Sequence, residues 1–289
     1  MSFDIFGSDL RRSVNKPDIT PLRYEIMASH LPLKRESHLQ AGVETEALRG
    51  EIFNVYESRD GWLFGQLERD KYVGWIELLS DNFDTSKSVI PAHQRGRAVA
   101  LISSSIWVTH KVKVPRTFTY PAPSMKLPSM GALSLGSALQ IVEVKGDFAV
   151  TAQNEYIWAE HLCEINEFKS DFVSVAEQFL HVPYLWGGKT SLGLDCSGLV
   201  QISLQAAGID APRDSDMQAN ELGVYVDISD VQRGDLVFWK GHVGIMVDSS
   251  ALLHANGHHM MVVKESFAGA VTRIKEKSFG DVTCVKRVV

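Results

Sequence analysis

The alternation of apolar and polar residues predicts short strands in the N-terminal half of the chain. Residues 51–57, 61–67 and 72–78 alternate in this way and are rich in aromatic and β-branched side chains, which is typical of half-buried strands. The tetrapeptide Ser-Arg-Asp-Gly at 58–61 predicts a hairpin turn between the first two strands, because its glycine can adopt a positive φ. This half of the chain is therefore predicted to be all β.

The strand pattern occurs twice along the sequence. The stretch that begins at Gly50 aligns with the stretch that begins at Gly136, and the alignment puts Trp75 against Trp158. A repeat of short strands predicts two small β-barrels in tandem. Chance similarity between strand-like runs is the alternative.

The pattern changes after residue 166. Residues 171–181 place their apolar side chains on one helical face, and residues 196–208 predict a second helix that ends at a glycine. Helices followed by a run of antiparallel strands indicate an α+β domain. The predicted strands are 234–239, 242–248, 251–256 and 260–266.

These patterns together predict a chain of several domains. We expect an N-terminal segment (1–20), a first barrel (21–82), a polar linker (83–96), a second barrel (97–165) and the α+β domain (166–289).

Composition and charge exclude several classes of protein. The chain has 289 residues, 45% of them hydrophobic, and a net charge of −6 with scattered lysines and arginines. This argues against binding to nucleic acid or to an anionic membrane surface. The first residues are too polar for a secretory signal, and no apolar run reaches the roughly 18 residues of a membrane helix. We therefore expect a cytoplasmic protein.

The three cysteines are Cys163, Cys196 and Cys284. Their odd number and wide spacing argue against a disulfide framework, and without a CxxC pair a zinc site built from thiolates is not expected. Free thiols in a reducing compartment are the simplest interpretation, and one of these thiols is a candidate nucleophile.

Cys196 has the sequence context of a reactive thiol. It follows Asp195 and precedes Ser197 and Gly198 at the start of a predicted helix. Unpaired N–H groups at a helix N-terminus favour the thiolate and lower the pKa of a cysteine. Asp195 can cap the helix, and the two small residues leave room for a substrate. A small buried core residue is the alternative interpretation of Cys196.

Two histidines can supply the base that this thiol needs. His242 begins one predicted strand and His254 lies in the next, so a short turn between antiparallel strands would bring the two rings side by side. One ring could accept the thiol proton while the other holds it in the correct tautomer. A zinc site formed by these histidines with Cys196 is the alternative, although no further carboxylate or cysteine is spaced to complete it.

Five short motifs resemble one known family. The sequences PYLWGG, DCSGLV, RGDLVFW, GHVGIMV and LLHA follow one another over residues 170–289. They resemble the NlpC family of papain-like cysteine peptidases, which cut bacterial cell-wall peptides. The two upstream barrels look like the bacterial SH3-type domains that commonly precede such domains. By this resemblance Cys196 is the nucleophile, His242 the base and His254 its orienting partner.

The layout is most similar to the γ-D-glutamyl-L-diamino-acid endopeptidases, which release L-Ala-γ-D-Glu from murein peptides with a free N-terminal amine. An ammonium group requires carboxylates and other acceptors. The candidates close to the catalytic residues are Asp195, Ser197, Asp214 and Ser215.

The resemblance also implies three further substrate-binding residues. Tyr184 lines the site, where its hydroxyl could stabilise an oxyanion together with the backbone N–H of Cys196. Glu46 and Tyr72 of the first SH3-type domain are expected to contribute to substrate binding.

The sequence thus predicts an acyl-transfer enzyme that needs no metal or organic cofactor. We expect a monomer that hydrolyses murein peptides in cytoplasmic recycling of the cell wall, and meso-diaminopimelate and L-Lys are the two alternatives for the preferred diamino acid. Another acyl-transfer enzyme on the same fold, such as an amidase or an acyltransferase, is one alternative. A non-catalytic module that binds wall peptides is the other.

Overall fold

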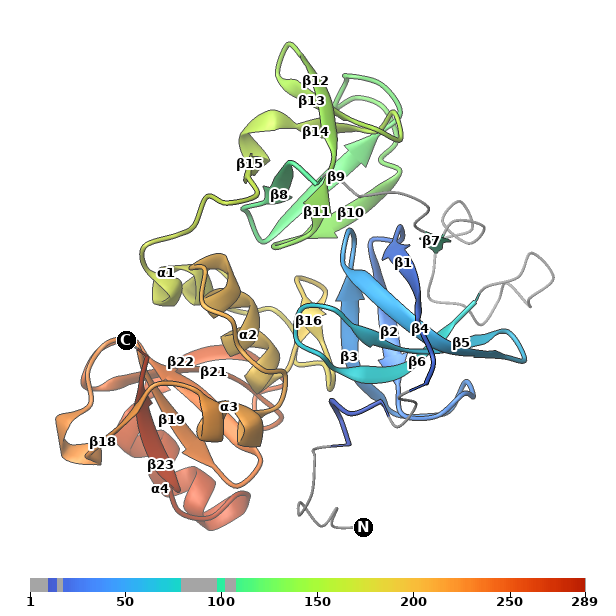
Figure 1. Ribbon diagram of the computed structural model, residues 1–289. Coiled ribbons are helices and arrows are strands. Elements are labelled where there is room, and N and C mark those ends of the chain that lie inside the picture. The colour runs from blue at the N-terminus through green and yellow to red at the C-terminus, as the bar shows by residue number, and fades with distance from the viewer. Residues whose placement is uncertain (1–9, 15–17, 79–97, 102–107, 289) are drawn as a thin grey trace. The chain divides into compact units, whose positions relative to one another are not determined.

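The computed structural model describes residues 10–14, 18–78, 98–101 and 108–288. The chain divides into two compact units, Met1–Ile165 and Asn166–Val289 (Figure 1). The predicted linker 83–96 lies outside the described residues, as does part of the predicted N-terminal segment. No helix among the described residues is long and apolar enough to cross a membrane.

The first part of the N-terminal unit is a seven-stranded antiparallel sheet in the order β3-β2-β6-β5-β4-β1-β7. Asp60 and Gly61 both have positive φ in the turn that joins β4 to β5, as a two-residue hairpin of this type requires. The predicted hairpin is therefore confirmed. The strands are β1 (Leu22–Ile26), β2 (His30–Lys34), β3 (Val43–Leu48), β4 (Ile52–Arg59), β5 (Trp62–Leu67), β6 (Val73–Glu77) and β7 (Val99–Leu101).

The second part of this unit contains a five-stranded sheet, β10-β9-β14-β13-β12, and a three-stranded sheet, β11-β8-β15. Its β12-β13-β14 meander corresponds to β4-β5-β6, and Gly50 and Gly136, which the sequence repeat aligns, both have positive φ. The elements are β8 (His110–Val112), β9 (Arg116–Tyr120), β10 (Gly131–Ser134), β11 (Ala138–Leu139), β12 (Ile141–Lys145), β13 (Phe148–Thr151), β14 (Tyr156–Trp158), the 3-10 helix η2 (Ala159–His161) and β15 (Leu162–Glu164).

The C-terminal unit is built on a six-stranded antiparallel sheet in the order β18-β23-β19-β20-β21-β22. The four strands predicted in this region are all present. The elements are α1 (Phe172–Glu177), β16 (Lys189–Thr190), β17 (Gly193–Leu194), α2 (Cys196–Ala206), α3 (Ser215–Glu221), β18 (Val224–Val226), the 3-10 helix η3 (Ile228–Asp230), β19 (Asp235–Trp239), β20 (His242–Met246), β21 (Ala251–Asn256), β22 (Met261–Ser266), α4 (Phe267–Lys277) and β23 (Cys284–Arg287).

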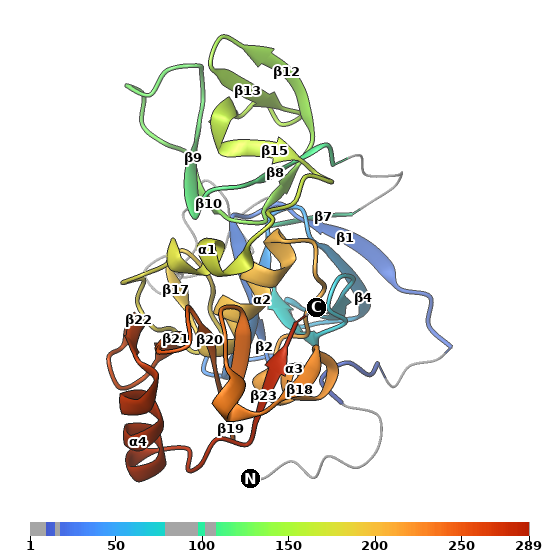
Figure 2. The same ribbon diagram turned by 90° about the vertical axis from the view of Figure 1, so that its left-hand side faces the viewer.

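The two faces of this sheet pack against different helices (Figure 2). Met246 and Leu252 join Ile274 of α4 in one buried cluster. Because side chains alternate along a strand, the neighbouring Ile245 and Leu253 face the opposite side, where α2 packs against β20 and β21. His242 is four residues from Met246 on β20, and His254 is two residues from Leu252 on β21. Residues an even number apart on a strand share a face, so both histidine side chains lie on the α4 face.

The first predicted helix is shorter than the sequence pattern indicates. It was expected over residues 171–181, but α1 ends at Glu177. His181 has a positive φ, and the backbones of His181 and Val182 form hydrogen bonds with Val262 of β22. Pairing with the sheet edge, ahead of a proline that disfavours helix at Val182, therefore ends the helix early.

Candidate active site

Cys196 is the first residue of α2, and the local sequence explains its position. Oδ1 of Asp195 accepts a hydrogen bond from the backbone N–H of Gly198 at 2.7 Å and so caps the helix. A Cβ atom at position 198 would lie 2.3 Å from the carbonyl oxygen of Gly188, so only glycine permits this close packing. The predicted helix N-terminus and its cap are confirmed.

The thiol of Cys196 is held in its neutral form. Burial, reinforced by the charge of Asp195, raises its pKa to about 12, against the opposing effects of the Val243 and Ser197 backbone N–H groups and of Arg213. The Ser197 N–H at the helix N-terminus acts to lower the pKa, as expected, but the pKa is raised overall because Cys196 is only 8% exposed and desolvation outweighs the helix end. Ionisation of the thiol therefore requires a partner that takes its proton.

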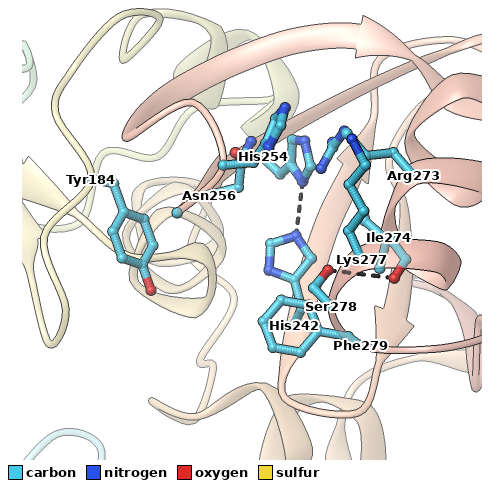
Figure 3. A pocket seen from close by; sticks show the side chains of 11 residues that line it. Tyr184, His242, His254, Asn256, Arg273, Ile274, Lys277, Ser278 and Phe279 are labelled. Atoms are coloured by element: carbon cyan, nitrogen blue, oxygen red, sulfur yellow. Dashed lines mark hydrogen bonds between the residues drawn. The ribbon is translucent and has the colours of Figure 1, made fainter.

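The two predicted histidines are in contact. Ile245 pairs with Leu253 across β20 and β21, and continuing this register places His254 diagonally from His242 on the same face. Nε2 of His242 lies 2.8 Å from Nδ1 of His254 (Figure 3). The structure thus brings the two rings together, as the strand argument predicts.

A carboxylate that the sequence analysis did not identify completes this arrangement. Nε2 of His254 lies 2.7 Å from Oε1 of Glu265 on β22, and Arg273 of α4 donates to the same oxygen. Although burial opposes it, hydrogen bonding to His254 and the charge of Arg273 lower the pKa of Glu265 to about 2. Glu265 is therefore ionised at neutral pH.

The charge on Glu265 determines which ring nitrogens carry protons. An ionised carboxylate only accepts hydrogen bonds, so His254 donates from Nε2 and, being neutral, keeps a lone pair on Nδ1. That lone pair accepts the Nε2–H of His242, which leaves Nδ1 of His242 unprotonated. Nδ1 of His242 is then the ring nitrogen that can accept a proton from a thiol.

The His242 ring is shielded by aromatic side chains. Phe279 stacks on it with ring centroids 5.3 Å apart, and Trp239 lies 5.6 Å from it. Burial is the main reason that the pKa of His242 is lowered to about 3. The charges of His254 and Arg273 act in the same direction, and the charge of Glu265 opposes them. The pocket around these rings therefore holds a neutral imidazole.

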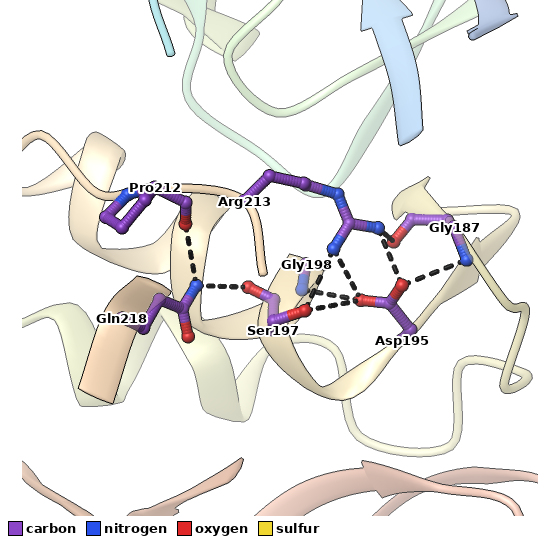
Figure 4. Close-up of polar contacts among 8 residues, drawn as sticks. Gly187, Asp195, Ser197, Gly198, Pro212, Arg213 and Gln218 are labelled. Atoms are coloured by element: carbon purple, nitrogen blue, oxygen red, sulfur yellow. Dashed lines mark hydrogen bonds and ion pairs between the residues drawn. The ribbon is translucent and has the colours of Figure 1, made fainter. Parts of the chain in front are cut away.

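Asp195 is engaged by the protein itself. Its two oxygens accept hydrogen bonds from Arg213 at 2.9 and 2.6 Å, and Oδ2 also accepts the N–H of Gly187 (Figure 4). The hydroxyl of Ser197 accepts a further hydrogen bond from the fully buried Arg213. Arg213 thus neutralises the Asp195 carboxylate and binds the Ser197 hydroxyl, and the role of both residues in binding a substrate ammonium stays a prediction.

The other predicted residues of this domain are Asp214, Ser215 and Tyr184. Asp214 and Ser215 follow the buried Arg213 at the start of α3 and are partly exposed. Burial, together with the charges of Cys196 and Asp195, raises the pKa of Tyr184. The Tyr184 hydroxyl therefore stays protonated and can donate a hydrogen bond.

The two predicted residues of the N-terminal unit are both buried. Glu46 lies on β3 with its carboxylate 3.6 Å from the ring of His30, and Tyr72 immediately precedes β6. Their contribution to substrate binding stays a prediction.

The described cysteines Cys163, Cys196 and Cys284 are free thiols. Within the described ranges, no group of three or more His, Cys, Asp or Glu side chains is arranged to hold a metal ion.

A cysteine at a helix N-terminus in the same domain as a hydrogen-bonded histidine pair is suited to nucleophilic catalysis by a thiol. Residues 181–284 match the NlpC/P60 family, and residues 33–79 match the bacterial dipeptidyl-peptidase Sh3 domain. The C-terminal unit therefore belongs to the NlpC/P60 family of cysteine peptidases and follows a bacterial dipeptidyl-peptidase SH3 domain. The family resemblance and the first SH3-type domain are confirmed, whereas the second barrel stays a prediction.

Two curated relatives are similar to part of the chain. Dipeptidyl-peptidase 6 of Lysinibacillus sphaericus is 35% identical over 98 residues, which are 34% of this chain and 36% of that protein. A gamma-D-glutamyl-L-lysine dipeptidyl-peptidase of Bacillus subtilis is 39% identical over 93 residues, 29% of this chain and 31% of that protein. The chain thus spans about a third of the length of these relatives.

Solved structures extend the similarity of fold over most of the chain. An NlpC/P60 family protein from Bacillus cereus has a TM-score of 0.71 at 18% identity, covering 92% of this chain and 99% of that chain. An NlpC/P60 endopeptidase from Photobacterium damselae has a TM-score of 0.58 at 13% identity, covering 96% and 75%. At these identities the likeness is one of fold.

Proposed function

We propose that this protein is a cysteine endopeptidase that hydrolyses the bond between γ-D-Glu and the diamino acid of murein peptides whose N-terminal L-Ala is free. The observation that carries the proposal is the chain of hydrogen bonds from His242 through His254 to Glu265, in the same domain as the capped Cys196. The names of the two curated relatives support the substrate class.

The first half-reaction forms a thioester. The Sγ proton of Cys196 passes to Nδ1 of His242 while sulfur attacks the γ-carbonyl carbon of D-Glu. The backbone N–H of Cys196 and the hydroxyl of Tyr184 stabilise the oxyanion. Burial disfavours each charge alone, but the proton transfer creates thiolate and imidazolium together, so their attraction offsets part of this cost.

Collapse of the tetrahedral intermediate breaks the C–N bond, and the imidazolium of His242 gives its proton to the departing amine. In the second half-reaction, Nδ1 of His242 takes a proton from water as the hydroxide attacks the thioester. Collapse of the second tetrahedral intermediate breaks the C–S bond, and the sulfur of Cys196 takes the proton back from His242. The L-Ala-γ-D-Glu product forms as a carboxylic acid and releases its proton to solvent.

We propose that Asp214 and Ser215 bind the substrate ammonium, with further contributions from Glu46 and Tyr72 of the first SH3-type domain. Asp214 and Ser215 are both partly exposed and directly follow the buried Arg213 in the sequence. Asp214 is partly exposed, whereas Asp195 is buried and bound by Arg213. An ammonium held in this way would restrict the enzyme to peptides with a free amine.

We also propose that residues 97–165 are a second bacterial SH3-type domain, since the β12-β13-β14 meander corresponds to β4-β5-β6. A requirement for a free amine is expected of an enzyme that recycles murein peptides inside the cell. Such an enzyme would act poorly on intact, cross-linked wall.

The test is an assay of purified protein on L-Ala-γ-D-Glu-meso-diaminopimelate and on its N-acetylated form, each repeated with Cys196→Ala. We expect cleavage of the free-amine peptide alone, lowered about 1,000-fold or more by the substitution. Cys284→Ala, which removes another free thiol, is the matched control and should retain activity. Equal cleavage of both peptides would contradict the proposed ammonium-binding site. Cleavage of neither peptide would contradict the proposed peptidase activity.

A further inference from the structure

A pocket of about 270 Å³ opens between the two histidines and α4 (Figure 3). Its walls combine both rings with cationic and amide side chains from β21 and α4. The lining residues that bear on its chemistry are His242, His254, Asn256, His258, Arg273 and Lys277.

Asn256 presents a buried hydrogen-bond donor to this pocket. Its side chain is 5% exposed, and its Oδ1 accepts the backbone N–H of His259 at 2.8 Å. A backbone N–H can only donate, so this contact fixes the orientation of the amide. Nδ2 then has no hydrogen-bond partner within the described structure. A buried donor of this kind is satisfied by a ligand that supplies an oxygen acceptor.

The pocket is also positively charged. Arg273 and Lys277 are four residues apart on α4, so both lie on the side of the helix that lines it. Glu265, the neighbouring carboxylate, is already bound by His254 and Arg273. No described acidic side chain forms an ion pair with Lys277. The local charge thus favours an anion, in contrast to the net charge of −6 on the whole chain.

The position of the pocket indicates which part of a substrate it faces. In the proposed reaction the departing amine receives its proton from His242, so the leaving group lies at this ring. In a murein tripeptide the leaving group is a diamino acid, and its α-carboxylate is attached to the carbon that bears the departing nitrogen. The pocket begins at His242 and extends to α4, which places its cationic wall within reach of that group.

We propose that this pocket binds the α-carboxylate of the leaving diamino acid, with Asn256 and Lys277 as donors. The inference rests on the proposed function and deepens it. Both meso-diaminopimelate and L-Lys carry this carboxylate, so the pocket does not distinguish them. It favours peptides that end at the diamino acid, and together with a requirement for a free amine it selects short peptides free at both ends.

The test compares L-Ala-γ-D-Glu-meso-diaminopimelate with the same tripeptide whose diaminopimelate α-carboxylate is an amide. For the wild type we expect kcat/KM about tenfold or more higher for the acid. Asn256→Asp keeps the oxygen that binds His259 and replaces the donor with a negative charge, whereas Lys277→Met removes the cation. Each variant should lower the ratio of kcat/KM for the acid to kcat/KM for the amide about tenfold or more.

Lys275→Met is the matched control, because Lys275 lies on the same helix but is exposed and paired with Asp281 at 2.7 Å. It should leave the ratio of acid to amide unchanged. An unchanged ratio in Asn256→Asp and Lys277→Met would overturn the proposed carboxylate site while leaving the peptidase in place.

Failure of the proposed function gives a different result. If the wild type cleaves neither tripeptide, the site is tested by titrating ¹⁵N-labelled protein with free meso-diaminopimelate. Saturable shifts of the Asn256 side-chain amide that are lost in Lys277→Met would support the carboxylate site without any activity. No shift would overturn it.

Discussion

Two arginine–carboxylate pairs support the candidate active site, and they differ in what surrounds them. Asp195–Arg213 lies beneath the start of α2, where the arginine is completely buried and the carboxylate also caps the helix. Glu265–Arg273 lies behind the histidines, with both side chains partly exposed. The first pair holds the nucleophile's helix in place, whereas the second is hydrogen-bonded to His254 and also borders the pocket.

The comparison shows that a carboxylate next to a nucleophile in sequence can serve the fold. Asp195 adjoins Cys196, yet its oxygens serve the helix and Arg213. Glu265 is 69 positions away from the cysteine along the chain, and it is the acid that fixes the histidine tautomers. Asp195–Arg213 therefore supports the fold around the nucleophile, and Glu265–Arg273 supports the histidines.

The largest expected effect on stability comes from breaking the buried pair. Arg213→Met leaves Asp195 charged and unpaired, so we expect the free energy of unfolding of the C-terminal unit to fall by about 3–5 kcal/mol. Arg273→Met, which breaks the more exposed pair, should cost no more than about 2 kcal/mol. Hydrogen exchange of the α2 amides measures both changes. Equal losses in the two variants would contradict the structural role assigned to Asp195–Arg213.

A substitution in the second pair should change catalysis more than stability. Glu265→Gln removes the charge that keeps His254 protonated at Nε2, so we expect kcat to fall about tenfold or more with KM nearly unchanged. Glu265→Asp should restore part of the rate, and Glu276→Gln on the exposed side of α4 serves as the control. A change in KM alone, or a loss that follows thermal stability, would show that Glu265 does not position the base.

Much of the fold could be predicted because its signals are local. Short apolar runs identified β19 to β22, and the Ser-Arg-Asp-Gly stretch at 58–61 identified the β4–β5 hairpin. The end of α1 could not be predicted, because it depends on pairing between His181 and Val262, two residues far apart in the sequence. Tertiary hydrogen bonds override a helical pattern at such places.

The candidate site was predictable where neighbouring residues define it. The Asp195 cap on α2 could be predicted because Asp195 directly precedes Cys196. The contact between His242 and His254 could be predicted from the pairing of two successive strands. The roles of Glu265 and Arg273 depend on how α4 folds back beside β22, and a charged residue at a strand end is otherwise typical of surface. The raised pKa of Cys196 could not be predicted because burial is a tertiary property.

The measurement that tests the central claim most directly is the protonation state of the two histidines by long-range ¹H–¹⁵N NMR, in the absence of substrate. The account predicts that both rings are neutral with their proton on Nε2 at pH 7. It further predicts that His242 is unchanged at pH 5, because a pKa lowered to about 3 keeps the base form to lower pH than an ordinary histidine. A proton on Nδ1 of neutral His242, or an imidazolium at pH 7, would contradict the proposed relay from Glu265 to the thiol.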